Sequence, residues 1–307
     1  MFRTFRVTRP DVLQDESVGI RTVTWGFEAR YPLFTRIALV GVWILGILAA
    51  YEGIYQGITD ANLGNDAHAY WLAVQGDLTY DRVPGQEDAY LYSPAFALLI
   101  TPLGWLPWPV FLSVWIAINA IALIWLLAHV RLRWAVPFFL LCVPELVVGN
   151  VFLLIAACLA MGLRRPAVWA FPILTKVTTG IGLLWFVFRR QWRPLATALL
   201  TTALVIAVAA LFNAGAWIDW LQFLTSNTDG ARDGRIGFTL RVIVAVALMW
   251  WGARTGRTWV IAVSVLAAAP VSNLMTLTIL VAIPRLAEQR AAPMRRSADA
   301  GEQTLAH

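Results

Sequence analysis

The sequence predicts an all-α fold, a polytopic bundle of transmembrane helices. Of the 307 residues, 59% are hydrophobic and only 14% are charged, whereas soluble domains carry about 25% charged residues. Apolar runs of about 20 residues recur, and a helix of this length crosses the hydrocarbon core of a bilayer. Lipid cannot hydrogen-bond an open sheet edge, so the spanning segments must be helices. We expect about 8–10 membrane segments.

The apolar runs predict one membrane domain with a tail at each end. Residues 1–32 carry mixed charges, residues 286–307 are small, polar and expected to be disordered, and we place both in the cytoplasm. Residues 33–285 are the expected integral membrane domain, with a first span at 34–51 and an outer loop at 52–91. The later apolar segments are residues 92–106, 108–129, 134–147, 150–163, 166–188, 194–212, 238–252 and 258–284, and a second outer loop is expected at 213–237.

Arginines gather beside the apolar segments, where the positive-inside rule places them in the cytoplasm. The net charge of +6 therefore indicates membrane topology and no nucleic-acid partner. Strict alternation of full spans cannot satisfy every arginine cluster. The conflict eases if residues 92–106 or 166–188 are re-entrant and line protein or a water-filled cavity. The clusters are at residues 131–133, 164–165, 189–193, 254–257 and 285–296.

The stretch between the first two apolar segments is strongly acidic. Residues 52–94 carry seven carboxylates and one cation, Arg82. One interpretation is a connector kept soluble by its charges. The other is a place for aqueous chemistry, because Tyr, Trp and His accompany the carboxylates. These carboxylates are Glu52, Asp60, Asp66, Asp77, Asp81, Glu87 and Asp88.

Asp66 is the candidate base within this loop. It precedes AHAYWLAVQ and is expected to cap a short amphipathic helix that ends at Gly76. That helix is expected to turn Tyr70 and Trp71 toward the membrane surface. A carboxylate at this level can accept a proton from a sugar hydroxyl. The alternative is an N-cap with no further role.

Lys176 is the only lysine of the chain, and it lies inside an apolar run beside threonines. An ammonium in the bilayer core costs at least about 2.5 kcal/mol, so it needs a partner or a hydrated cavity. One interpretation is a site for an anion such as a phosphate, with the threonine hydroxyls as extra donors. The alternatives are snorkelling to an interface and a structural pair with Glu145.

A polar break separates the apolar runs 134–147 and 150–163. Glu145 is the one carboxylate in this apolar region, and Gly149 and Asn150 follow it. Glycine lets the backbone approach a ligand closely, and asparagine offers both donors and acceptors. The break is therefore either part of a binding cavity or a simple turn between helices.

Arginines of the second outer loop are further candidates. Arg232 and Arg235 are able to clamp a phosphate bidentately. The alternative is an exposed pairing with Asp229 or Asp233. The sequence shows no nucleotide loop, zinc spacing or nucleophile elbow, so we expect neither a metal nor another cofactor.

Several of these residues occur in a familiar order and spacing. They resemble glycosyltransferase family 87, the polyprenyl-phosphate-mannose-dependent enzymes of the GT-C group. The resemblance covers residues 34–200 and is fainter after that. The positions that carry the resemblance are Asp66, Tyr70, Gly76, Asp77 and Tyr80, then YLYSPAFALLITPLGWLP with Tyr92, then Gly149 and Asn150, then Lys176 ahead of an arginine-rich turn.

The resemblance implies a GT-C membrane fold and a reaction at the outer face of the cell membrane. Such enzymes move a sugar, here a hexose and most simply mannose, from a polyprenyl-phosphate carrier to a lipid or glycan acceptor. The family's catalytic aspartate corresponds to Asp66, and Lys176 is the natural partner of the lipid phosphate. The full set of expected substrate-binding residues is Lys176, Tyr70, Tyr92, Glu145, Gly149, Asn150 and Arg235.

Two other functions remain open from the sequence. A transporter or flippase would use Lys176 and Glu145 as charges at the midplane, but such proteins show paired repeat halves, and none is evident. A non-catalytic membrane assembly protein, descended from a transferase, is the other alternative. Replacement of Asp66 by Asn separates the three, because only a transferase would lose sugar transfer while it kept its fold.

Overall fold

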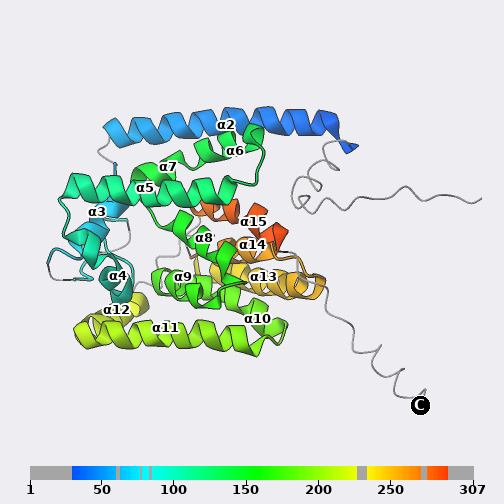
Figure 1. Cartoon of the computed structure of the whole chain (residues 1–307). Coiled ribbons are helices and arrows are strands. Elements are labelled where there is room, and N and C mark those ends of the chain that lie inside the picture. Colours follow the sequence, from blue (N-terminus) through cyan, green and yellow to red (C-terminus); the bar gives the residue numbers. More distant parts are fainter. Residues whose placement is uncertain are drawn as a thin grey trace, which may run out of the picture.

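A computed structural model of the chain describes residues 30–59, 63–76, 78–82, 85–226, 234–270 and 275–289. Within these ranges the fold is 80% helical and contains no strand. The helices form a bundle in which the longest members run roughly alongside one another (Figure 1). The predicted all-α, polytopic helical architecture is confirmed.

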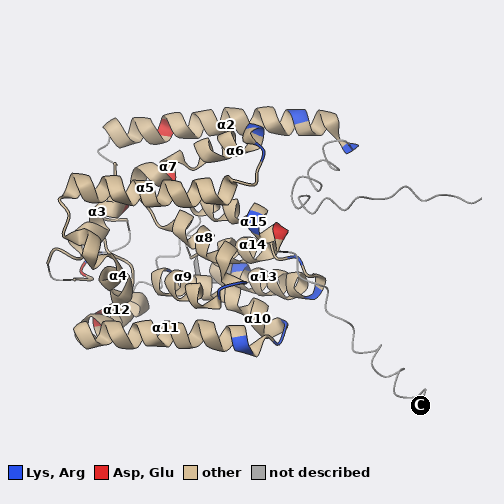
Figure 2. Ribbon diagram, viewed as in Figure 1, with Lys and Arg blue, Asp and Glu red and all other residues tan. Residues whose placement is uncertain are grey.

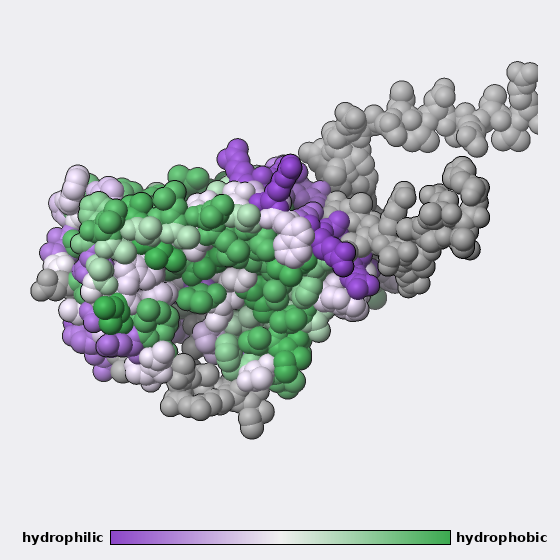
Figure 3. Space-filling view, turned by 90° about the horizontal axis from the view of Figure 1, so that it is seen from below, coloured by the Kyte–Doolittle hydropathy of each residue, from purple (hydrophilic) through white to green (hydrophobic). Residues whose placement is uncertain are grey.

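Four helices are long and apolar enough to cross a membrane, by length and composition. They contribute little surface to the interior, since at most 39% of the most apolar window of any one is buried. Apolar side chains on their outer faces cover much of the surface (Figure 3), as expected of helices that face lipid. The chain is therefore a membrane protein. The four are α2 (Pro32–Thr59), α5 (Trp108–Leu127), α11 (Trp192–Phe212) and α13 (Gly234–Thr255).

Shorter apolar helices pack among the long ones. The central one is α8 (Phe152–Gly162), whose buried face includes Leu153, Ile155 and Leu159. The others lie within or beside the apolar segments predicted at residues 92–106, 134–147, 166–188 and 258–284. They are α4 (Pro94–Gly104), α6 (Leu132–Leu141), α7 (Val143–Val148), η1 (Pro166–Trp169), α9 (Ala170–Thr175), η2 (Val177–Leu183), α10 (Leu184–Phe188), α14 (Val260–Ala267), η4 (Met275–Ala282) and α15 (Ile283–Glu288).

Glycines let α2 pack closely on α6 and α7. A Cβ atom on Gly46 would lie 2.7 Å from the carbonyl oxygen of Pro137, and one on Gly53 would lie 2.9 Å from Cα of Pro144. Small residues at membrane-helix interfaces allow such backbone contact, and dispersion then replaces the absent hydrophobic drive. This packing brings α7, with Glu145, beneath the end of α2.

The first and last predicted spans need correction. Helix α2 continues to Thr59, beyond the predicted end at residue 51, so Glu52 is helical and accepts a hydrogen bond from Gln56 one turn later. The predicted span 258–284 is divided into α14 and the η4–α15 segment, with residues 271–274 outside the described part. Apolar composition set both predictions, and it does not sense a polar helical extension or an interruption.

The second predicted outer loop is partly helical. Helix α12 spans Ala214–Ser226, and its buried residues Ala216, Trp220 and Phe223 recur at helical spacing. The indole nitrogen of Trp220 donates to the carbonyl of Leu91, 3.4 Å away, and so ties α12 to the loop before α4. The prediction read the polar residues of this segment and missed its apolar face.

Lys and Arg residues concentrate at one end of the bundle, where α2 begins and α13 ends (Figure 2). Several of them stack on tryptophan rings. The guanidinium carbons of Arg254 and Arg257 lie 4.8 and 4.7 Å from the ring centroids of Trp250 and Trp251. Arginine over tryptophan is a favourable cation–π contact, and both residue types are common at membrane interfaces.

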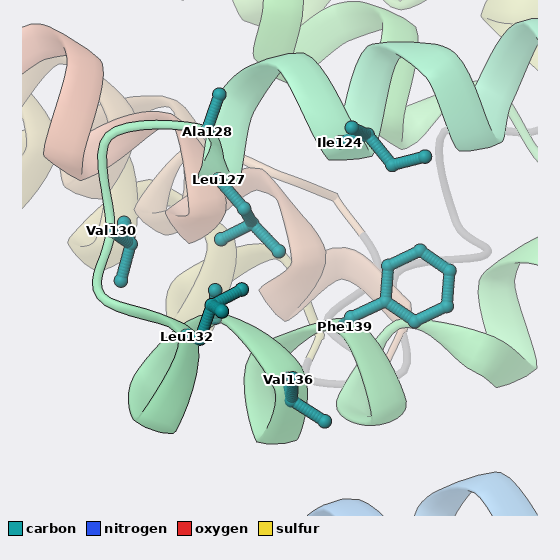
Figure 4. A pocket seen from close by; sticks show the side chains of 8 residues that line it. Ile124, Leu127, Ala128, Val130, Leu132, Val136 and Phe139 are labelled. Atoms are coloured by element: carbon teal, nitrogen blue, oxygen red, sulfur yellow. The ribbon is translucent and has the colours of Figure 1, made fainter.

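A groove of about 270 Å³ lies between the end of α5 and the start of α6 (Figure 4). All of its lining residues are apolar, so it offers no group for acid–base chemistry or phosphate binding. They are Ile124, Leu127, Ala128, Val130, Leu132, Ala135, Val136 and Phe139.

Trp169 fixes the packing of η1 against α8 and η2. The side chain is fully buried, and a Cβ atom on Gly162 would lie 2.5 Å from its indole nitrogen. A Cβ atom on Gly182 would contact the far edge of the same ring even more closely. The two glycines therefore form a slot for the indole.

Replacement of Gly182 by Ala is expected to destabilise the protein by about 1–3 kcal/mol, since the added methyl overpacks a rigid ring. Gly180 in the same 3-10 helix is the matched control, because a Cβ there meets only Ile173 at 3.8 Å. Thermal unfolding in detergent compares the two variants. Equal melting temperatures for G182A and G180A would show that the slot does not constrain Trp169.

Candidate functional site

Asp66 lies in the first turn of α3, which spans Asn65–Leu72. The helix begins at Gly64, whose φ of 73° is left-handed and whose N–H donates to the carbonyl of Val147 at 2.7 Å. Gly64 is therefore the N-cap residue, and the predicted cap by Asp66 is wrong. Helix α3 also ends at Leu72, before the predicted end at Gly76. The Asp66 carboxylate is thus not engaged in capping.

Tyr70 faces the core, so the prediction that it faces the membrane surface is wrong. Only 1% of its surface is exposed. Its ring packs edge-on against Phe96 and Trp115, and its hydroxyl lies 2.9 Å from that of Tyr92. Contacts with α4 and α5 decide this orientation, and they are invisible in the local sequence.

The turn between α7 and α8 presses against α3. The carbonyl of Glu145 accepts hydrogen bonds from the N–H groups of Gly149 (3.0 Å) and Asn150 (3.3 Å). Gly149 has a φ of 75°, and a Cβ there would lie 2.7 Å from Cβ of Ala67, the neighbour of Asp66. The indole of Trp115 donates to the carbonyl of Gly149 at 2.7 Å. Only glycine satisfies both the backbone angle and the contact.

Asn150 connects this turn directly to Asp66. Its side chain is 7% exposed. Its Oδ1 accepts the N–H of Val151 at 2.6 Å, and its Nδ2 donates to Oδ2 of Asp66. Residues 84 positions apart in the sequence thus share one hydrogen bond.

Lys176 occupies the break between α9 and η2. Its extended backbone (φ −138°, ψ 100°) interrupts the helical path. Its ammonium lies 3.8 Å from the ring centroid of Phe152 and 5.6 Å from that of Tyr92, contacts that stabilise a cation. The ammonium forms no hydrogen bond with the residues that the structure describes, and no ion pair with them within 4 Å. Its three N–H donors are therefore unoccupied by these residues.

Glu145 interacts electrostatically with this ammonium. It is 1% exposed, and its Oε1 accepts the N–H of Phe152, the first residue of α8, at 3.0 Å. Its Oε2 has no hydrogen-bond partner within the described part of the chain. Lys176 interacts electrostatically with both Glu145 and Asp66. One cation therefore serves two carboxylates.

The surroundings of Asp66 change the pKa of its carboxyl group. Burial raises the pKa of its carboxyl above the ordinary aspartate value, while the charge of Lys176 and the hydrogen bond from Asn150 partly offset that rise. Asp66 and Lys176 each keep part of their surface accessible, whereas Glu145 and Asn150 are buried. A carboxylate and a cation thus interact electrostatically in a region where both residues are partly exposed.

A second polar cluster supports the same helix, and the sequence did not reveal it. Nδ1 of His68 lies 2.6 Å from Oδ1 of Asp88, and Nη1 of Arg82 lies 3.4 Å from the other oxygen. Asp88 has a φ of 56°, which is unusual for a residue other than glycine. Only the acidic, His-containing character of the loop pointed to such a pairing.

Other candidate residues contribute less. The side chains of Arg232 and Arg235 lie outside the described residues. The hydroxyl of Thr175 donates to the carbonyl of Phe171, so it is not turned toward an anion. No group of three or more His, Cys, Asp or Glu residues that could hold a metal ion occurs in the described ranges.

Comparison with known proteins identifies the family. The model of glycosyltransferase family 87 matches residues 90–300, more than half of the chain. The match begins after Asp66 and includes the C-terminal third, where the sequence resemblance was faint, so the predicted extent of 34–200 needs correction. No curated protein and no solved structure matches. The match covers more than half of a helical membrane protein, so this chain belongs to glycosyltransferase family 87.

Proposed function

We propose that this glycosyltransferase moves a hexose, with mannose as the expected sugar, from a polyprenyl-phosphate carrier to a lipid or glycan acceptor. Family membership supports sugar transfer in general. The observation that supports the finer proposal is the electrostatic interaction of Asp66 with Lys176, a carboxylate from the loop after the first span and an ammonium from a broken helix. A lipid-linked donor needs both groups at one place.

The proposed reaction is a single inverting displacement. The acceptor hydroxyl gives its proton to Asp66 while its oxygen forms a bond to the anomeric carbon. The bond from that carbon to the phosphate oxygen breaks, and the electron pair stays on the phosphate. The Lys176 ammonium stabilises this developing charge, as a fixed cation does best in a site with little water.

We assign the other site residues by the groups that they contact, since Tyr70, Tyr92 and Glu145 are all buried. We assign Tyr92 to the donor end, because its ring lies beside the Lys176 ammonium. Tyr70 and Glu145 interact electrostatically with Asp66, so we assign them the support of Asp66 and Lys176. Lys176 already balances two carboxylates, and a phosphate therefore needs a second cation, for which Arg235 remains our candidate.

We infer that the site faces the extracytoplasmic side of the cell membrane. The support is the arginine-rich end of the bundle, which the positive-inside rule assigns to the cytoplasm. Helices α3 and α12 lie at the opposite end (Figure 2). A donor whose prenyl chain lies in the outer leaflet would present its phosphate at that level.

The D66N variant is expected to lose sugar transfer by at least about 10²-fold, the usual contribution of a general base. The assay incubates purified protein in lipid vesicles with labelled polyprenyl-phosphate hexoses and identifies lipid products by mass. D81N is the matched control, since Asp81 is an exposed carboxylate of the same loop. Equal activity of D66N and D81N would exclude Asp66 as the base, and transport of the lipid without product would favour a flippase.

The acid limb of the pH profile is expected to lie at different pH values for kcat/KM and for kcat. In the free enzyme, kcat/KM should fall as pH drops through the raised pKa of Asp66, which lies above the ordinary value of about 3.9. The donor phosphate adds negative charge and draws Lys176 toward itself, so the limb of kcat should lie at higher pH. Coincident limbs would argue against a phosphate beside Lys176.

A further inference from the structure

The side-chain amide of Asn150 has a fixed orientation. Its oxygen accepts the N–H of Val151 at 2.6 Å, and a backbone N–H can only donate. The nitrogen must therefore be the atom that faces Asp66, and it donates to Oδ2 of that carboxylate. The neighbour of Asp66 is thus an obligatory donor, which favours the ionised carboxylate.

The turn that carries Asn150 is held against α3. Gly149 contacts Ala67 closely, Trp115 donates to the carbonyl of Gly149, and Gly64 donates to the carbonyl of Val147. Three contacts therefore hold the amide beside Asp66. The Asn150 amide engages only Oδ2 of the Asp66 carboxylate. The other oxygen, Oδ1, accepts no hydrogen bond from any residue in the described ranges.

We propose that Asn150 is a positioning residue for the catalytic base. It holds Oδ2 of Asp66, favours the ionised carboxylate and leaves Oδ1 directed to the acceptor hydroxyl. The inference rests on the proposed function for the role of Asp66 and adds a residue that acts through it. It replaces the expectation that Asn150 contacts substrate.

Several other charged or titratable groups interact electrostatically with Asp66, and the substitutions at Asn150 leave their residues unaltered. Lys176 faces Asp66 from the break between α9 and η2, and Glu145 faces it from α7. Tyr70 on α3 and Tyr92 before α4 are the neighbouring phenols. Helix α5 contributes the uncharged Trp115.

The N150D variant removes the Nδ2 donor of Asn150 and keeps the side-chain oxygen that accepts the N–H of Val151. Aspartate has the same shape and can still accept the N–H of Val151, but it turns an acceptor toward Asp66 and adds a like charge. The N150A variant removes the amide without adding charge. N119A is the matched control, because Asn119 is an equally buried asparagine whose amide bonds only within α5, to the carbonyl of Trp115.

The experiment measures protonation of Asp66 without relying on activity. Dicyclohexylcarbodiimide modifies protonated carboxyls, and peptide mass analysis of the full-length protein in lipid nanodiscs gives the pH midpoint of modification at Asp66. We expect the midpoint to rise by about one pH unit in N150A, the effect of losing a hydrogen bond to a charged group. It should rise further in N150D and stay at the wild-type value in N119A.

The acid limb of kcat/KM, measured on the same proteins, should move with that midpoint. Unchanged midpoints in N150D and N150A would overturn the inference, as would a raised donor KM with an unmoved acid limb, which marks a substrate contact. Shifted midpoints in a protein that transfers no sugar would uphold the amide contact and overturn the proposed function instead. The two failures are therefore distinguishable.

Discussion

The electrostatic attraction between the Asp66 carboxylate and the Lys176 ammonium is the interaction on which the proposed site depends. A solitary lysine in an apolar bundle is costly unless it has an anionic neighbour or water. Here two carboxylates and two aromatic rings surround it, yet no hydrogen bond from the described residues occupies it. Its donors are therefore open to a further anion, and we propose that this anion is a phosphate shared with a second cation.

Departures from regular helix geometry place Asp66 and Lys176 in the same part of the fold. Gly64 starts α3 in a left-handed conformation, Gly149 turns the chain between α7 and α8, and Lys176 interrupts the path from α9 to η2. Each irregularity frees backbone polar groups, which within a membrane are tolerated only where protein or water satisfies them. Close packing of α2 on α6 at Gly46 and on α7 at Gly53 then holds both short helices against α2. The long helices α2, α5, α11 and α13 contribute mainly apolar surface that faces lipid.

Much of this arrangement follows from the sequence. Apolar length predicts α5 and α11. The arginine clusters indicated only that residues 92–106 or 166–188 are re-entrant, so the helix break at Lys176 itself was not predicted. Long-range packing is what local patterns miss. The burial of Tyr70 depends on α4 and α5, and the helical character of α12 depends on the loop that Trp220 contacts. The bond from Asn150 to Asp66 depends on a turn 84 residues away.

The double-mutant cycle of D66N and K176M on unfolding free energy tests the central claim most directly. Each single substitution leaves a partly buried charge with less compensation, and the double substitution removes both charges. The account predicts that the double variant is more stable than the sum of the single effects, with a coupling of at least about 0.5 kcal/mol. Strictly additive effects would mean that the two charges do not interact, and the proposed site would then lose its basis.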